Sequence, residues 1–180
     1  MPKFGWLLDA KRCVECRACE AACKQWNNLD TGVRLRQVRT FESGKFPQVR
    51  TQALSLACNH CDEPACIGVC PVKALSRNEA TGGVIQDHAA CIGCQQCVRA
   101  CPYSAPVYDT KTRKVFKCTF CVDRTSVGLE PACATLCPTG ALQYLPWEEI
   151  LARGASDTSE NFPTPATTNP RIRFVGDLWS

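Results

Sequence analysis

The sequence contains no run of apolar residues that approaches the roughly 18 required for a membrane-spanning helix. Residues 1–9 also lack the basic start, the long apolar stretch and the small-residue cleavage site of a secretory leader. We therefore expect a soluble chain without a cleaved leader. Any contact with a membrane would then depend on a partner protein.

Apolar residues other than cysteine are scarce. Hydrophobic residues make up 45% of the 180 residues, but this share includes sixteen cysteines. Without the cysteines the apolar share falls to about 36%, which is thin for a hydrophobic core that must hold a fold by itself. We expect the cysteines, through bonds that they make, to supply the missing stability.

The cysteines form four groups of four along the chain, an internal repeat that leaves none over. In the last three groups the final cysteine precedes a proline, which ends the short helix carrying the last two cysteines. In chain order the groups are Cys13, Cys16, Cys19 and Cys23; Cys58, Cys61, Cys66 and Cys70; Cys91, Cys94, Cys97 and Cys101; and Cys118, Cys121, Cys133 and Cys137.

The third group has the spacing Cys-x2-Cys-x2-Cys-x3-Cys-Pro, which is typical of iron-sulfur proteins. Its two-residue steps turn three thiolates toward one cluster, while the fourth cysteine lies one helical turn further and reaches a neighbouring cluster. Groups two and three are one hairpin apart, so we expect them to exchange their fourth cysteines, and groups one and four to do the same. The predicted ligand sets for four 4Fe-4S clusters are Cys13, Cys16, Cys19 and Cys137; Cys58, Cys61, Cys66 and Cys101; Cys70, Cys91, Cys94 and Cys97; and Cys23, Cys118, Cys121 and Cys133.

Other interpretations of the cysteines fit the spacing less well. Cysteines two residues apart have poor geometry for a disulfide scaffold. Structural zinc sites usually combine two separated Cys-x2-Cys pairs, whereas here a third cysteine follows in the same loop. A 3Fe-4S cluster, or an open iron site for substrate chemistry, would need a missing ligand, and none is missing.

The formal charge of +4 suggests nucleic-acid binding only if the cysteines are neutral. If sixteen thiolates hold four cores of charge 2+, each site carries about two negative charges. The net charge of the loaded chain is then about 4 − 8 = −4. The basic residues then balance the clusters. His60, inside the second group, is able to tune a cluster through a hydrogen bond, although a plain loop role is the simpler interpretation.

We expect an α+β fold with short helices, small antiparallel hairpins and two pseudo-symmetric ferredoxin-like lobes. The outer lobe comprises residues 4–30 and 103–145, and the inner lobe comprises residues 58–102. Residues 31–57 form an inserted hairpin, and residues 146–180 form a helix followed by a partner-docking arm. The predicted strands are 4–9, 33–41, 48–57, 74–78, 84–87, 107–108, 115–116 and 141–145, with a helix at 146–153.

From about residue 154 the composition shifts to Ser, Thr, Asn and Pro, and we expect this stretch not to bury enough apolar area to order itself. The last residues differ, because apolar side chains there alternate with charged ones. They predict an arm that docks on the surface of this chain or of a partner. The apolar residues of the arm are Ile172, Phe174, Val175, Leu178 and Trp179.

The cysteine pattern resembles the four-cluster iron-sulfur subunit of membrane-associated molybdopterin oxidoreductases, such as dimethyl sulfoxide and polysulfide reductases. The matching segments are 13–24, 58–66, 91–103 and 117–121, and the resemblance extends from about Phe4 to Leu145. In the related nitrate reductases a tryptophan replaces one ligand of group three. Cys94 is intact here, which fits the branch whose clusters are all 4Fe-4S.

The resemblance implies a non-catalytic subunit that relays single electrons. Its partners would be a large molybdenum or tungsten bis-pterin subunit, nearest the cluster that Cys137 closes, and a quinone-reactive membrane anchor or another carrier. It also implies a place at the periplasmic face of the inner membrane, held there by partners. Similar polyferredoxins serve formate dehydrogenases, hydrogenases and tungsten aldehyde oxidoreductases, so these complexes, and a zinc-binding interaction module, remain alternatives.

Overall fold

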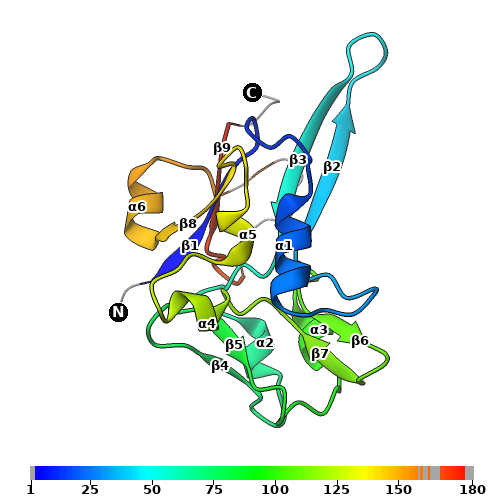
Figure 1. Cartoon of the computed structure of the whole chain (residues 1–180), viewed down its shortest axis with the longest axis vertical. Coiled ribbons are helices and arrows are strands. Elements are labelled where there is room, and N and C mark those ends of the chain that lie inside the picture. Colours follow the sequence, from blue (N-terminus) through cyan, green and yellow to red (C-terminus); the bar gives the residue numbers. More distant parts are fainter. Residues whose placement is uncertain (1–2, 158, 160–161, 163–166, 177–180) are drawn as a thin grey trace.

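The computed structural model describes residues 3–157, 159, 162 and 167–176. The fold is α+β, with short helices and small sheets arranged as a body from which one hairpin projects (Figure 1). Within the described part of the chain, no helix has the length and hydrophobicity of a membrane span.

A three-stranded sheet joins the two ends of the chain. Its central strand, β1 (Phe4–Asp9), pairs antiparallel with β8 (Leu142–Pro146) and parallel with β9 (Ile172–Val175). Segments far apart in the sequence therefore lie side by side, as the predicted pairing of the first and last cysteine groups requires.

Three antiparallel hairpins account for the remaining described strands, and each lies where the sequence predicts one. The longest, β2 (Gln37–Ser43) with β3 (Arg50–Leu56), is the hairpin that projects from the body in Figure 1. The other two are short: β4 (Leu75–Arg77) with β5 (Val84–Gln86), and β6 (Val107–Asp109) with β7 (Lys114–Phe116).

The helices are brief, and prolines mark the start of several. Pro64, Pro131 and Pro146 are the N-cap residues of α2, α5 and α6. The first helix follows no such proline and runs on to Trp26, with Asn27 as its C-cap. The helices are α1 (Ala18–Trp26), α2 (Ala65–Gly68), α3 (Gln96–Ala100), α4 (Val122–Thr125), α5 (Ala132–Thr135) and α6 (Trp147–Ala152).

Aromatic side chains and cysteines share one core. Trp6 packs edge-on against Phe120, with ring centroids 5.2 Å apart, and Phe120 packs in the same way on Tyr144 at 5.1 Å. The indole Nε1 of Trp6 donates a hydrogen bond of 3.1 Å to the carbonyl of Cys58. The central strand is thereby tied directly to the second cysteine group.

The expectation that the stretch after residue 154 buries too little apolar area to order itself does not hold at Phe162. Phe162 is buried because its ring stacks on Tyr103 at 5.2 Å and contacts Phe174 at 5.0 Å. The hydroxyls of Tyr103 and Thr168 lie 2.8 Å apart, within hydrogen-bond distance. Packing against these distant aromatic rings supplies the apolar burial that the local composition lacks.

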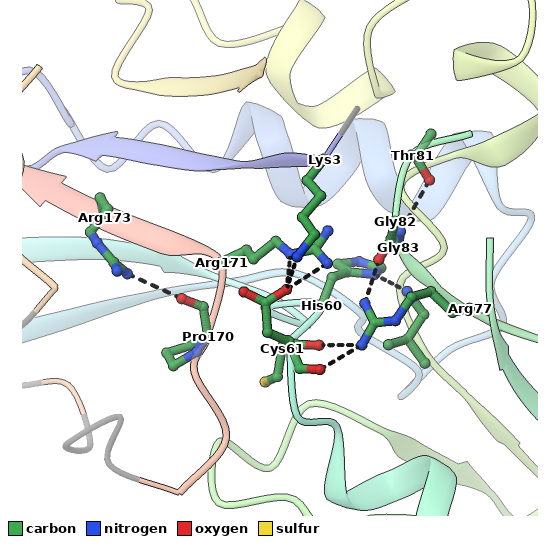
Figure 2. A network of polar contacts seen from close by, with 12 residues as sticks. Lys3, His60, Cys61, Arg77, Thr81, Gly82, Gly83, Pro170, Arg171 and Arg173 are labelled. Carbon is green, nitrogen blue, oxygen red and sulfur yellow. Dashed lines mark hydrogen bonds and ion pairs between the residues drawn. The ribbon is translucent and has the colours of Figure 1, made fainter. Parts of the chain in front are cut away.

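The described part of the arm docks on this chain. Arg171 is 0% exposed and its Nε and Nη2 atoms donate to one carboxylate oxygen of Asp62, at 2.9 and 2.8 Å. Figure 2 shows Arg171 beside Lys3, and the ammonium of Lys3 lies 3.2 Å from the same Asp62 oxygen. Leu178 and Trp179, also predicted to dock, lie outside the described residues.

Candidate iron-sulfur centres

The loops of all four cysteine groups share one backbone feature. The residue just before the second cysteine has a left-handed conformation in every group: Glu15 (φ 56°), His60 (φ 46°), Gly93 (φ 70°) and Phe120 (φ 59°). A side chain at Gly93 would not fit, because its Cβ would lie 2.0 Å from the carbonyl oxygen of Arg113. The repeated turn directs successive thiols to one side of each loop.

Three cavities are each lined by four cysteines, of which three come from one group and one from another. These are combinations that the spacing predicts, although iron ligation itself stays a prediction. The three sets are Cys13, Cys16, Cys19 and Cys137; Cys58, Cys61, Cys66 and Cys101; and Cys70, Cys91, Cys94 and Cys97.

The remaining four cysteines, Cys23, Cys118, Cys121 and Cys133, are all buried. Cys23 lies on α1 and Cys133 on α5, and these two helices pack against each other. Burial raises the pKa of Cys23 to about 12, and the charges of Cys133 and Cys121 act in the same direction. The structure therefore brings the fourth predicted set together in the interior.

Burial is the largest influence on the pKa values of many of these thiols. It raises the pKa of Cys66 to about 12 and that of Cys61 to about 11, and neighbouring cysteine charges act in the same direction. A positive core that binds the sulfur atoms offsets this repulsion and stabilises the thiolates. The donor chemistry of the sites thus fits iron-sulfur clusters.

Arg36 is a buried cation among these cysteines. It is 2% exposed, its guanidinium carbon lies 4.3 Å above the Trp6 ring, and its Nη1 donates to the carbonyl of Ser55 at 3.0 Å. Its Nε and Nη2 atoms are buried without a hydrogen-bond partner. Burial alone would lower the pKa of Arg36, but the charges of nearby thiolates outweigh it and raise the pKa. Those thiolates belong to Cys133, Cys118, Cys19 and Cys23.

An unpaired buried cation is costly, so Arg36 requires negative charge close by. A 4Fe-4S core held by four thiolates carries about two negative charges. Arg36 belongs to none of the cysteine groups, and the sequence analysis missed it. No local signal distinguishes it from the exposed Arg34 and Arg39 beside it, because only the packing of the hairpin buries it.

Several N–H and O–H groups point at the cysteine sulfurs. The backbone amides of Ala74 and Phe120 donate to Cys70 and Cys118 at 3.3 and 3.4 Å. Burial acts to raise the pKa of Cys137, but hydrogen bonds from the Leu142 amide and the Thr139 hydroxyl outweigh it, so this pKa is lowered. Donors of this kind stabilise sulfur ligands of clusters.

All sixteen cysteines, each within the described part of the chain, are free thiols. Among the residues with assigned structure, no three His, Cys, Asp or Glu side chains converge closely enough to hold one metal ion.

Exposure differs strongly between the sets. Cys16 and Cys94 are exposed, and each stands near an exposed apolar residue: Val14 is 63% exposed and Ile92 is 62% exposed. The set that contains Cys118 has no exposed member. Two of the predicted cluster sites therefore reach the surface and one is enclosed.

Two family models match the chain. A 4Fe-4S dicluster domain matches residues 49–145, more than half of the chain, and a 4Fe-4S binding domain matches residues 10–26. The second match covers all four cysteines of group one and the whole of α1.

Curated relatives match most of the chain. One chain of the anaerobic dimethyl sulfoxide reductase of Haemophilus influenzae is 35% identical over 96% of this protein and 88% of its own length. A subunit of the sulfite dehydrogenase of Allochromatium vinosum is 36% identical, covering 78% of this protein and 68% of the relative. A subunit of the tetrathionate reductase of Salmonella typhimurium is 38% identical, covering 77% of this protein and 56% of the relative. These identities are too similar to single out one enzyme.

Proposed function

This protein belongs to the 4Fe-4S dicluster family of iron-sulfur subunits of molybdopterin oxidoreductases, and from this we propose that it relays single electrons through four 4Fe-4S clusters. It catalyses no reaction on a substrate. The observation that carries the proposal is the cavity lined by Cys58, Cys61, Cys66 and Cys101. It combines three cysteines of one group with the fourth of the next, as the two-cluster ferredoxin motif requires.

We assign the cysteine ligands in the same way throughout. Each cluster takes three ligands from its own group and one from the paired group. The sets are Cys13, Cys16, Cys19 and Cys137 for cluster 1; Cys58, Cys61, Cys66 and Cys101 for cluster 2; Cys70, Cys91, Cys94 and Cys97 for cluster 3; and Cys23, Cys118, Cys121 and Cys133 for cluster 4.

Bound clusters supply one-electron redox chemistry, each core alternating between a 2+ and a 1+ state. The chain holds the thiolates in position, excludes water from the enclosed set and offsets negative charge through Arg36 and the N–H groups near sulfur. A two-electron reaction at the catalytic subunit is completed by two successive one-electron transfers through this chain. The electrons are exchanged at the other end with a quinone or another carrier.

Interactions between cysteines of different sets support one order of the clusters. Cys19 of cluster 1 interacts electrostatically with Cys133 of cluster 4, and Cys118 of cluster 4 interacts with Cys58 of cluster 2. Clusters 2 and 3 share the packed helices α2 and α3. We propose the order 1, 4, 2, 3, with the exposed cysteines Cys16 and Cys94 at the two ends. Electrons enter at one exposed end and leave at the other.

The proposal includes partners for both ends. The catalytic subunit, which carries a molybdenum or tungsten bis-pterin, docks near cluster 1, and a quinone-reactive membrane anchor or another carrier docks near cluster 3. Through these partners the subunit is held at the periplasmic face of the inner membrane. We also divide the chain into two pseudo-symmetric lobes, residues 4–30 with 103–145 and residues 58–102, joined by the hairpin at 31–57 and followed by the docking segment 146–180.

Metal analysis of the complex, produced with its catalytic subunit and purified without oxygen, tests this proposal. Four 4Fe-4S clusters correspond to about sixteen iron atoms and sixteen acid-labile sulfides per chain, beyond those of the partner. Electron paramagnetic resonance (EPR) of the reduced sample should show interacting 4Fe-4S signals. Stoichiometric zinc with negligible iron would instead establish a zinc-binding module.

A further inference from the structure

His60 connects two of the predicted cluster sites. It lies in the loop of group two, between Cys58 and Cys61, and is 0% exposed. Its Nδ1 atom accepts a hydrogen bond of 3.0 Å from the backbone amide of Val84. Its Nε2 atom lies 3.4 Å from the Sγ atom of Cys118, a ligand of a different cluster in our assignment.

The Val84 contact determines which ring nitrogen carries the proton. A backbone amide can only donate, so Nδ1 is the acceptor and the proton of the neutral ring is on Nε2. That N–H therefore points to the sulfur of Cys118. The ring has little freedom to turn away, because it stacks on Phe120 with centroids 3.5 Å apart.

The surroundings of His60 also favour this arrangement. Figure 2 shows the ring within a network that includes Arg77 and Arg171, and the side chain of Arg77 donates to the carbonyls of Cys61 and Gly82 at 3.0 and 2.7 Å. These bonds fix the loop that carries His60. The histidine is held from three sides, by Phe120, Val84 and its own loop.

We infer that His60 is a positioning residue that donates a hydrogen bond to the Cys118 thiolate and thereby raises the reduction potential of cluster 4. A donor to sulfur stabilises a cluster more strongly after it gains an electron, because negative charge on the ligands increases. Since His60 belongs to the loop of cluster 2, it also supplies a hydrogen-bonded link between two neighbouring clusters. This inference rests on the proposed function.

Two substitutions separate the two hydrogen bonds of His60. Asparagine can keep an acceptor for the Val84 amide but is too short to reach Cys118. Glutamine can reach the sulfur with an amide N–H. In the anaerobically purified complex, H60N should lower the equilibrium constant for reducing one cluster about tenfold. For a one-electron couple this corresponds to a midpoint potential lower by about 59 mV. H60Q should lower the same midpoint potential by no more than half as much as H60N.

The measurement is a potentiometric titration followed by EPR, with iron content determined for every sample. Unchanged potentials in a fully loaded H60N sample overturn the inference while leaving the proposed function intact. Equal shifts in H60N and H60Q also overturn it, because they indicate a general packing effect. A wild-type complex whose chain lacks iron overturns the proposed function, and the inference with it.

A second measurement detects the hydrogen bond itself in the wild-type complex. The chain contains only two histidines, His60 and His88. In the complex labelled with ¹⁵N-histidine, pulsed EPR of the reduced clusters should show coupling to one histidine nitrogen of this chain. The coupling should persist in H88Q and disappear in H60Q. Its absence in the wild type, or its loss in H88Q, would refute the hydrogen bond from His60.

Discussion

Replacement of Arg36 by methionine is the most direct test of the electrostatics of the proposed relay. The substitution removes one buried positive charge and keeps an unbranched side chain. The Nη1 atom of Arg36 and the Sγ atom of Cys19 each lie 3.2 Å from the Ser55 hydroxyl oxygen. The Nη1 atom of Arg36 and the Sγ atom of Cys19 are therefore at most twice that distance apart.

The expected size of the effect follows from Coulomb's law. An electron added to a cluster spreads beyond the nearest sulfur, so we take a mean separation of about 8 Å from the guanidinium. With an effective dielectric constant of about 20, the interaction is about 2 kcal/mol, or about 90 mV for a one-electron couple. R36M should lower the potential of cluster 1 or cluster 4, or of both, by about this amount.

A redox titration of the intact complex, followed by EPR, measures this shift. R36K is the matched variant that keeps the charge, and it should change the potentials by less than half as much. R39M removes the same charge from an exposed position three residues away on the same hairpin. Because water screens that site, its effect should be at most a quarter as large.

Two results would refute this reasoning. One is a fully loaded R36M protein whose potentials equal those of the wild type. The other is an equal shift in R36K and R36M, which would show that the lost hydrogen bonds to Ser55, rather than the charge, set the potentials.

Three further predictions concern the cysteine ligands, the loop of group three and the C-terminal segment. C137S should alter the EPR spectrum of cluster 1, and a change confined to cluster 4 would contradict the exchange of fourth ligands. G93A should lower the free energy of unfolding by about 1–3 kcal/mol and reduce the iron content, because Gly93 has a left-handed backbone and faces a backbone carbonyl. The control G68A, in a helix and with open space around it, should leave the thermal stability unchanged or raise it. R171M should destabilise the protein by about 2 kcal/mol, since it removes a fully buried guanidinium that donates two hydrogen bonds to the partly exposed Asp62. K3M at a half-exposed position should cost less than about 1 kcal/mol, and equal losses of melting temperature would contradict this.

The sequence alone accounts for the repeated part of this protein. Two-residue steps between cysteines determine local turns, so spacing predicts the four groups and the combination of each fourth cysteine with another group. Three cavities of the structure contain such a combination. The hairpins between the groups were also predictable, because alternating apolar residues flank short turn sequences such as Thr81-Gly82-Gly83. Local chain geometry decides these features.

Only the tertiary structure determined what surrounds the cysteines. The burial of Arg36, the contact of His60 with Cys118 and the docking of Arg171 on Asp62 each join residues that lie many positions apart. Phe162 is buried by distant aromatic rings although its own segment is rich in polar residues. Such contacts depend on how the hairpins and helices pack, and their charges and hydrogen bonds act through space, so no local pattern in the sequence encodes them.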